Sequence, residues 1–402
     1  MFLRRCFYHL ALLALLTVAC LAPGWAADNA ALVTATNDFG FRLYAQLAKT
    51  DGGKNLFISP VSLNLALAMT YNGAHGSTQQ AMAKTLGWDA LSLAQVNDGY
   101  QSLTNTLCTA DPKNARLLLA NSLWLSKRDT FVPAFLQRNK RAYGAEMATV
   151  DFTDPRTMTR VNNWVSAQTA KKIPTIIHPG DFDGNTVLAL LNALYFKGTW
   201  SKAFDKAQTT TGSFTKLDGT KQSVPMMHKT GGFSCYQDET LQVAKLPYGN
   251  GKLSLVILLP RDKKSPQDFA AQLTPANWQH WMQELHPCND KDDSLALPRF
   301  KAEYSAELKN ALSAMGMAEA FRPGADFTNM VQHGDIWIKL VRHKTAIEVN
   351  EAGTEAAAAT EVVMAKLADS KAFRMTVDHP FIFAIVADDG TIVFLGSIVD
   401  PK

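Results

Sequence analysis

The second half of the chain is a series of short apolar runs separated by turn residues, and this pattern limits the fold more than any other feature. It predicts strands at 241–246, 253–259, 295–300, 337–349 and 373–377. A further pair of runs, 381–386 and 392–398, flanks Asp388-Asp389-Gly390, which is a strong signal for a β-hairpin. The second half therefore predicts large antiparallel sheets.

The first half mixes both kinds of element. Helical spacing is found at 37–48, 62–71 and 161–172, and apolar strand-like runs lie at 117–125 and 187–196. Ser59, just before Pro60, suits a helix N-cap. Helices and strands are interleaved without strict βαβ alternation, which predicts an α+β fold. Although 402 residues could form two or three domains, the chain has no clear interdomain linker.

The N-terminus has the pattern of an export signal. Arg4 and Arg5 precede an apolar run at 10–18, and small residues follow up to Ala26. The run is too short to span a bilayer as a helix, and the alternative is a buried N-terminal element. We expect cleavage after Ala26, which leaves 27–402 as a single domain.

A second processing pattern overlaps the first. Thr17-Val18-Ala19-Cys20 resembles a bacterial lipoprotein cleavage box, with Thr17 in place of the usual Leu. The expected location is therefore secreted or periplasmic, with a lipid anchor on Cys20 as the alternative.

The number and spacing of the cysteines indicate that the hydrophobic core, rather than disulfide bonds, stabilises the fold. The chain has five, at positions 6, 20, 108, 235 and 288, and the first two lie in the signal. Cys108, Cys235 and Cys288 are widely spaced and form no C-x-x-C pair, which disfavours a disulfide scaffold or a zinc site. At most one bridge can form among them.

Several function classes lack their sequence signals. The chain contains no G-x-S-x-G, H-E-x-x-H, P-loop or G-x-G-x-x-G motif, so we expect no enzyme, cofactor or metal. The net charge of +4 does not call for a nucleic-acid partner. His280, His286 and Cys288 do not share a helix face and fit a surface segment. The basic residues at 138, 140 and 141 fit a solvated helix face.

The segment at 351–370 is the most informative. Read with period two, it places Thr354, three further uncharged small residues, Val362 and Met364 on one face, and Glu355 and Glu361 on the other. Such a strand could enter a sheet with its small residues inward. An exposed Ala-rich helix is the alternative.

Several motifs resemble those of the serpin family. His343-Lys344 and the run Glu348 to Thr360 resemble the hinge motif, and 378–383 and 396–401 resemble the C-terminal signature. The segments 55–62, 192–200 and 297–300 resemble family segments as well, in the expected order. The resemblance covers nearly all of the mature chain.

The resemblance implies a single domain with three β-sheets, eight or nine helices and an exposed reactive-centre loop at about 351–372. It also implies an irreversible suicide-substrate inhibitor, which traps a serine protease as an acyl-enzyme when the cut loop inserts into the main sheet. The implied hinge consists of Gly353, Thr354, Glu355, Ala356, Ala357, Ala358, Ala359 and Thr360. The implied shutter positions are Ser59, Ser62, Asn192 and His343, and Trp200 is the breach position.

The family's usual loop length places the reactive bond between Leu367 and Ala368, with Lys366–Leu367 as the alternative. The target is then a protease of chymotrypsin-, elastase- or subtilisin-like specificity, or of trypsin-like specificity if Lys366 is read. A non-inhibitory carrier or chaperone and a cysteine-protease inhibitor remain alternatives. We expect a monomer. We also expect no heparin-type site, because 91–107 has no Lys or Arg.

Overall fold

The computed structural model describes residues 22–262, 265–332, 335–354 and 372–401. In these ranges the chain forms three β-sheets and nine α-helices, as the family resemblance implies. The helices are α1 Ala22–Asp51, α2 Pro60–Tyr71, α3 Gly76–Leu86, α4 Leu93–Thr109, α5 Pro133–Tyr143, α6 Pro155–Gln168, α7 Pro266–Phe269, α8 Pro275–Gln283 and α9 Lys309–Leu312.

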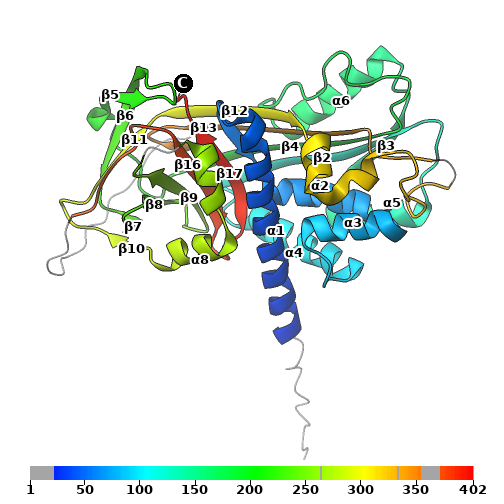
Figure 1. Cartoon of the computed structure of the whole chain (residues 1–402), viewed down its shortest axis with the longest axis horizontal. Helices are drawn as coiled ribbons and strands as arrows, with labels where there is room; N and C mark the ends of the chain where they lie inside the picture. Colours follow the sequence, from blue (N-terminus) through cyan, green and yellow to red (C-terminus); the bar gives the residue numbers. More distant parts are fainter. Residues whose placement is uncertain (1–21, 263–264, 333–334, 355–371, 402) are drawn as a thin grey trace, which may run out of the picture.

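The six-stranded sheet is the centre of the molecule. In spatial order it contains β12 Phe300–Glu307, β13 Leu340–Val349, β4 Leu188–Thr199, β2 Ala115–Ser126 and β3 Glu146–Val150, and β14 Gly353–Thr354 adds to β4. Helix α6 covers one face, while α2 lies on the other (Figure 1). Alternate residues of β4 divide between two cores: Leu190 and Leu194 belong to the main core, and Leu191 and Ala193 to the core under α6.

Two further sheets hold the second half of the chain. One has seven strands, in the order β1 Leu56–Ile58, β17 Ile392–Ile398, β16 Phe381–Ala387, β9 Leu253–Pro260, β8 Leu241–Tyr248, β7 Phe233–Gln237 and β10 His286–Cys288. The other has four, in the order β15 Arg374–Thr376, β11 Ser294–Pro298, β6 Lys221–Thr230 and β5 Thr210–Thr215.

The C-terminal hairpin forms as predicted from its turn. Phe381 pairs with Ile398 and Ile385 with Phe394, and the register shifts at Val386 beside the turn. Because β16 and β17 are buried along their whole length, their runs are continuously apolar rather than alternating.

Local signals explain the helix ends. Ser59 caps α2 as predicted, and its hydroxyl accepts a hydrogen bond from the backbone N–H of Ser62 at 3.2 Å. Helix α6 occupies 155–168 rather than the predicted 161–172. Its start is capped by Asp154, and Ala170 and Lys171 have φ of 49° and 64°, so the helix cannot continue to Lys172.

The N-terminal helix contains the predicted processing point. Helix α1 begins at Ala22, so the expected cleavage after Ala26 falls in the turns that point away from the rest of the molecule (Figure 1). Cys20 lies outside the described residues. Among the helices that the structure describes, none has the length and apolar character needed to cross a bilayer.

Candidate functional site at the opening of the six-stranded sheet

Two neighbouring strands of the six-stranded sheet separate at one end. β13 pairs with β4 in parallel from Leu340, opposite Ala189, to Ala346, opposite Tyr195. Beyond this point the chain turns back after Asn350, and β14 occupies the place beside β4. β13 and β4 are therefore paired along most of β13 and separated at one end, where β14 begins a new strand between them.

Gly353 allows this strand to begin. It pairs with Thr199 and has φ of 138°, a backbone conformation that side chains disfavour. A Cβ at this position would lie 2.2 Å from the carbonyl oxygen of Gly198. Two backbone hydrogen bonds with Asn350, of 2.8 and 3.1 Å, close the turn that precedes the strand.

Thr354 is fully buried, although its chain leads into the predicted loop. Its hydroxyl lies 3.0 Å from the hydroxyl of Tyr248, at the end of β8. Trp200 stacks on Tyr248 at 4.4 Å between ring centroids, and its indole N–H donates to the carbonyl of Asn350 at 2.9 Å. The aromatic pair therefore holds the turn on one side and the first inserted side chain on the other.

An ion pair fixes the chain just before the turn. Glu351 is 2% exposed, and Arg299 donates to its carboxylate from Nε at 2.8 and 2.9 Å and from Nη2 at 2.5 Å. Thr209 donates to the same carboxylate at 2.6 Å. Burial raises the pKa of Glu351, but these hydrogen bonds outweigh it and lower the pKa below its ordinary value. We call Trp200, Tyr248, Arg299, Glu351 and Thr354 the breach cluster.

A second polar cluster lies under the middle of the sheet. Asn192 of β4 pairs with Asn121 of β2 on one side and with His343 of β13 on the other. Its side-chain amide donates to Asn121 and to the Ser62 carbonyl, the latter at 2.9 Å. The backbone N–H of Ser59 donates to His343 Nε2 at 3.1 Å. We call Ser59, Ser62, Asn121, Asn192 and His343 the shutter cluster.

His343 is neutral in this cluster. Burial lowers its pKa to about 3, since the charged form would lose its hydration. Because Nε2 accepts from Ser59, the proton is on Nδ1, which donates to the side-chain oxygen of Asn192. This hydrogen bond crosses from β13 to β4, so a strand that enters between the two must break it.

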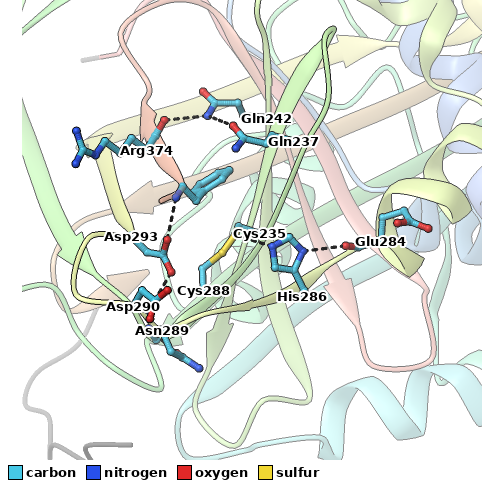
Figure 2. Close-up of a disulfide and its surroundings, with 12 residues drawn as sticks. Cys235, Gln237, Gln242, Glu284, His286, Cys288, Asn289, Asp290, Asp293 and Arg374 are labelled. Carbon is cyan, nitrogen blue, oxygen red and sulfur yellow. Dashed lines mark hydrogen bonds between the residues drawn. A yellow bond between two sulfur atoms is a disulfide. The ribbon is translucent and has the colours of Figure 1, made fainter. Parts of the chain in front are cut away.

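The far end of the predicted loop is also held. Phe373 donates its backbone N–H to Asp293 at 2.8 Å and accepts from the backbone N–H of Ser294 at 2.8 Å. Gln242 donates to the carbonyl of Arg374 at 2.9 Å, as Figure 2 shows. The segment predicted as the loop is therefore flanked by Thr354, which is paired in the sheet, and by Phe373, which is hydrogen-bonded to Asp293 and Ser294.

The structure describes seven of the residues predicted for the site and brings them together in two groups. The four predicted shutter residues lie in one cluster, and Trp200, Gly353 and Thr354 lie in another. Glu355, Ala356, Ala357, Ala358, Ala359, Thr360, Lys366, Leu367 and Ala368 lie outside the described residues. The first residues of the predicted loop at about 351–372 are packed against the body of the molecule, where Glu351 is buried and Thr354 belongs to the sheet.

Sequence reasoning missed the remaining members. Asn121, Tyr248 and the Arg299–Glu351 pair have no local pattern that joins them, because their partners are 52 to 106 residues away. Arg299 and Glu351 each lie in a family-like segment, 297–300 and 348–360, but the sequence gave no sign that the two side chains meet.

Comparison with known proteins identifies the relatives of this arrangement. The family model described as Serpin (serine protease inhibitor) matches residues 34–401. A leukocyte elastase inhibitor of Xenopus laevis is 35% identical over 380 residues, which are 92% of this chain and 99% of that protein. The crystal structure of the thermophilic serpin tengpin in the native state has a TM-score of 0.82 at 30% identity and covers 92% of this chain and 94% of its own.

Human thyroxine-binding globulin complexed with thyroxine has a similar structure. Its TM-score is 0.84 at 27% identity, with 93% of this chain and all of the other chain covered.

Proposed function

Because the chain belongs to the serpin family, we propose that it inhibits a serine endopeptidase of elastase-like or chymotrypsin-like specificity. The function is that of an irreversible suicide-substrate inhibitor, and it needs no catalytic group of the inhibitor itself. The observation that supports it best is the pairing of Gly353 and Thr354 with β4. The strand that must form during inhibition has already begun there.

The inhibitory step starts with ordinary proteolysis. The hydroxyl of the protease's catalytic serine attacks the carbonyl carbon of the scissile bond, the peptide bond breaks, and the new amino terminus leaves with a proton. The serine remains as an ester on the loop. The loop residues after Thr354 then continue the strand between β4 and β13, and each ladder hydrogen bond stabilises the product by about 0.5–1.5 kcal/mol.

The polar clusters control this step. The breach cluster holds the two hinge residues at the open end, so the strand can grow only from that end. The shutter cluster keeps β4 and β13 together, and its hydrogen bonds can form again around the new strand, because the amide of Asn192 remains fixed by Ser62 on α2.

The target specificity rests on the residue before the scissile bond. Leu367 before Ala368 fits a chymotrypsin-, elastase- or subtilisin-like pocket, and Lys366 before Leu367 fits a trypsin-like one. The elastase inhibitors among the relatives favour the first reading.

Incubation with a panel of proteases tests the proposal. A matched protease should give a complex that survives boiling in detergent, and mass spectrometry of the released C-terminal peptide should show Ala368 as its first residue. A peptide that begins at Leu367 would assign Lys366 to the protease pocket. Free turnover of the cut chain with every serine protease would contradict inhibition.

Two other functions remain as candidates of the same family. The structural likeness to thyroxine-binding globulin favours a carrier, which predicts cleavage without trapping. Trapping of a papain-like enzyme alone would indicate a cysteine-protease inhibitor instead.

We also propose that the chain is exported as a monomer. Export is supported by the charged start, the apolar run and the small residues before Ala27. Mass spectrometry of the mature N-terminus distinguishes a chain that begins at Ala27 from one lipidated on Cys20, and sedimentation gives the oligomeric state. An intact Met1 in the purified native protein would contradict export by cleavage.

A further inference from the structure

We propose that Cys235, His286 and Cys288 form a metal site that opens when their disulfide is reduced and that binds Zn²⁺. None of the three residues belongs to the breach cluster or the shutter cluster, and the proposal does not rest on the inhibitory function. Cys235 and Cys288 are joined as a disulfide, with 5.8 Å between their Cα atoms.

The strand register brings the three side chains to one face. β10 pairs with β7 so that His286 lies directly opposite Cys235, and Cys288 follows two residues after His286. Residues that are paired, or two apart on a strand, project to the same side of a sheet. The two cysteines are buried, and His286 is exposed on β10, the edge strand of the sheet. Figure 2 shows the His286 ring beside the disulfide.

The distances fit a tetrahedral metal. His286 Nε2 lies 3.8 Å from Cys235 Sγ, and the possible ligand atoms of all three residues lie within 4.8 Å of one another. Zn–S bonds of about 2.3 Å and Zn–N bonds of about 2.0–2.1 Å place two ligands of a tetrahedron about 3.6 Å apart. The histidine therefore already stands at the separation of a metal ligand from Cys235.

A backbone carbonyl orients the histidine. The carbonyl oxygen of Glu284 lies 3.3 Å from His286 Nδ1, which places the proton on Nδ1 and leaves the lone pair of Nε2 directed at Cys235 (Figure 2). Metal-binding histidines usually have such a partner for their second nitrogen. A disulfide alone does not need an imidazole lone pair directed at it.

The chemistry balances with a dithiol reductant. The dithiol gives two electrons and two protons to the Cys235–Cys288 bond, which becomes two thiols, and the reductant becomes a cyclic disulfide. Zn²⁺ then replaces the two thiol protons. Two thiolates, a neutral imidazole and Zn²⁺ make a neutral complex, which suits the buried cysteines, and the fourth position is left to water on the exposed side of His286.

Cobalt binding tests the site with a visible probe. In a chain with Cys6, Cys20 and Cys108 replaced by Ser, Cys235 and Cys288 are the only thiols. After reduction by a phosphine, Co²⁺ should bind in equimolar amount and give the thiolate charge-transfer band and the strong visible bands of tetrahedral coordination. Zn²⁺ should displace it, and the oxidised protein should give neither band.

Two histidine variants decide the ligand set. His286→Ala should weaken Co²⁺ binding more than about tenfold. His280→Ala is the matched control, because this histidine lies near by on α8 and contacts Tyr236 instead. Both changes are at exposed side chains, so a cooperative melt should confirm folding. The proposal is wrong if the reduced protein gives no thiolate–cobalt band, or if His286→Ala binds Co²⁺ as tightly as the His280→Ala control.

Discussion

Replacement of Thr354 by Arg should convert the inhibitor into a substrate. Thr354 is fully buried against the hydroxyl of Tyr248. The acidic member of the breach cluster, Glu351, already accepts hydrogen bonds from Arg299 and Thr209. A guanidinium at position 354 would therefore be buried without a free carboxylate in the breach cluster.

The cost can be estimated from this environment. An unpaired buried charge costs several kcal/mol. If about 3 kcal/mol of this opposes strand growth, insertion slows by about 100-fold, since each 1.4 kcal/mol or so is a factor of ten in rate. Hydrolysis of the acyl-enzyme then overtakes insertion.

The assay is titration of the matched protease, with detection of detergent-stable complex. The parent should inhibit at close to equimolar ratio, and Thr354→Arg should be cut and released with at least a tenfold higher ratio of inhibitor consumed per protease. Thr354→Val replaces the hydroxyl with a methyl group, loses the hydrogen bond to Tyr248 at about 0.5–1.5 kcal/mol, and should still trap. Glu355→Arg brings the same charge to the position predicted to face away. Unchanged trapping by Thr354→Arg, or equal loss in Glu355→Arg, would refute the insertion register.

Three further outcomes are expected. Burial lowers the pKa of His343 in the folded protein to about 3, so its contribution to the free energy of unfolding should be complete above about pH 6.5. Below that pH the free energy of unfolding should fall by up to about 1.4 kcal/mol per pH unit toward about pH 3. Urea titrations of the parent and of His343→Gln check this, and the same dependence of stability on pH in the variant would contradict it. Arg299→Met should lower the free energy of unfolding by about 2 kcal/mol, because it leaves the buried Glu351 carboxylate without its ion-pair partner; the partial exposure of Arg299 limits the loss. The melting midpoint should fall by a few degrees, and Arg299→Lys should lower it less. A single cut within 366–368 should raise the midpoint by more than about 10 °C, because the freed strand can join the sheet, and an unchanged or lower midpoint would favour a carrier.

Local patterns were enough to predict much of the fold. The predicted runs 253–259 and 392–398 appear as β9 Leu253–Pro260 and β17 Ile392–Ile398, because a buried strand bounded by turns leaves its whole signal in adjacent residues. The run predicted from 337 becomes a strand only at Leu340, where pairing with β4 begins. The end of α6 was misjudged because the left-handed conformations of Ala170 and Lys171 have no signal in their side chains.

The residues of the candidate site were likewise predicted only in part. The hinge and shutter residues were available from the family-like motifs, but the partners that fix them come from other elements. The Cys235–Cys288 bond joins two strands across 53 residues of sequence. The sequence left room for one bridge among three cysteines but did not indicate which pair forms it. Cys288 was placed on a surface segment, but it is buried, because β10 lies against β7.

The register of β14 on β4 determines how far along the sheet each loop residue would reach after insertion. If the pairs Gly353–Thr199 and Thr354–Gly198 continue, Thr360 comes to lie opposite Asn192 and Met364 opposite Leu188, the first residue of the strand. Leu367 would follow three residues further on, about 10 Å past the end of β4 at the rise of a strand. A protease tethered there would be drawn up against the end of the sheet opposite the breach. One or two added residues in the loop would lengthen the connection between the inserted strand and the protease. The mechanical force on the bound protease would then fall without any change in the hinge.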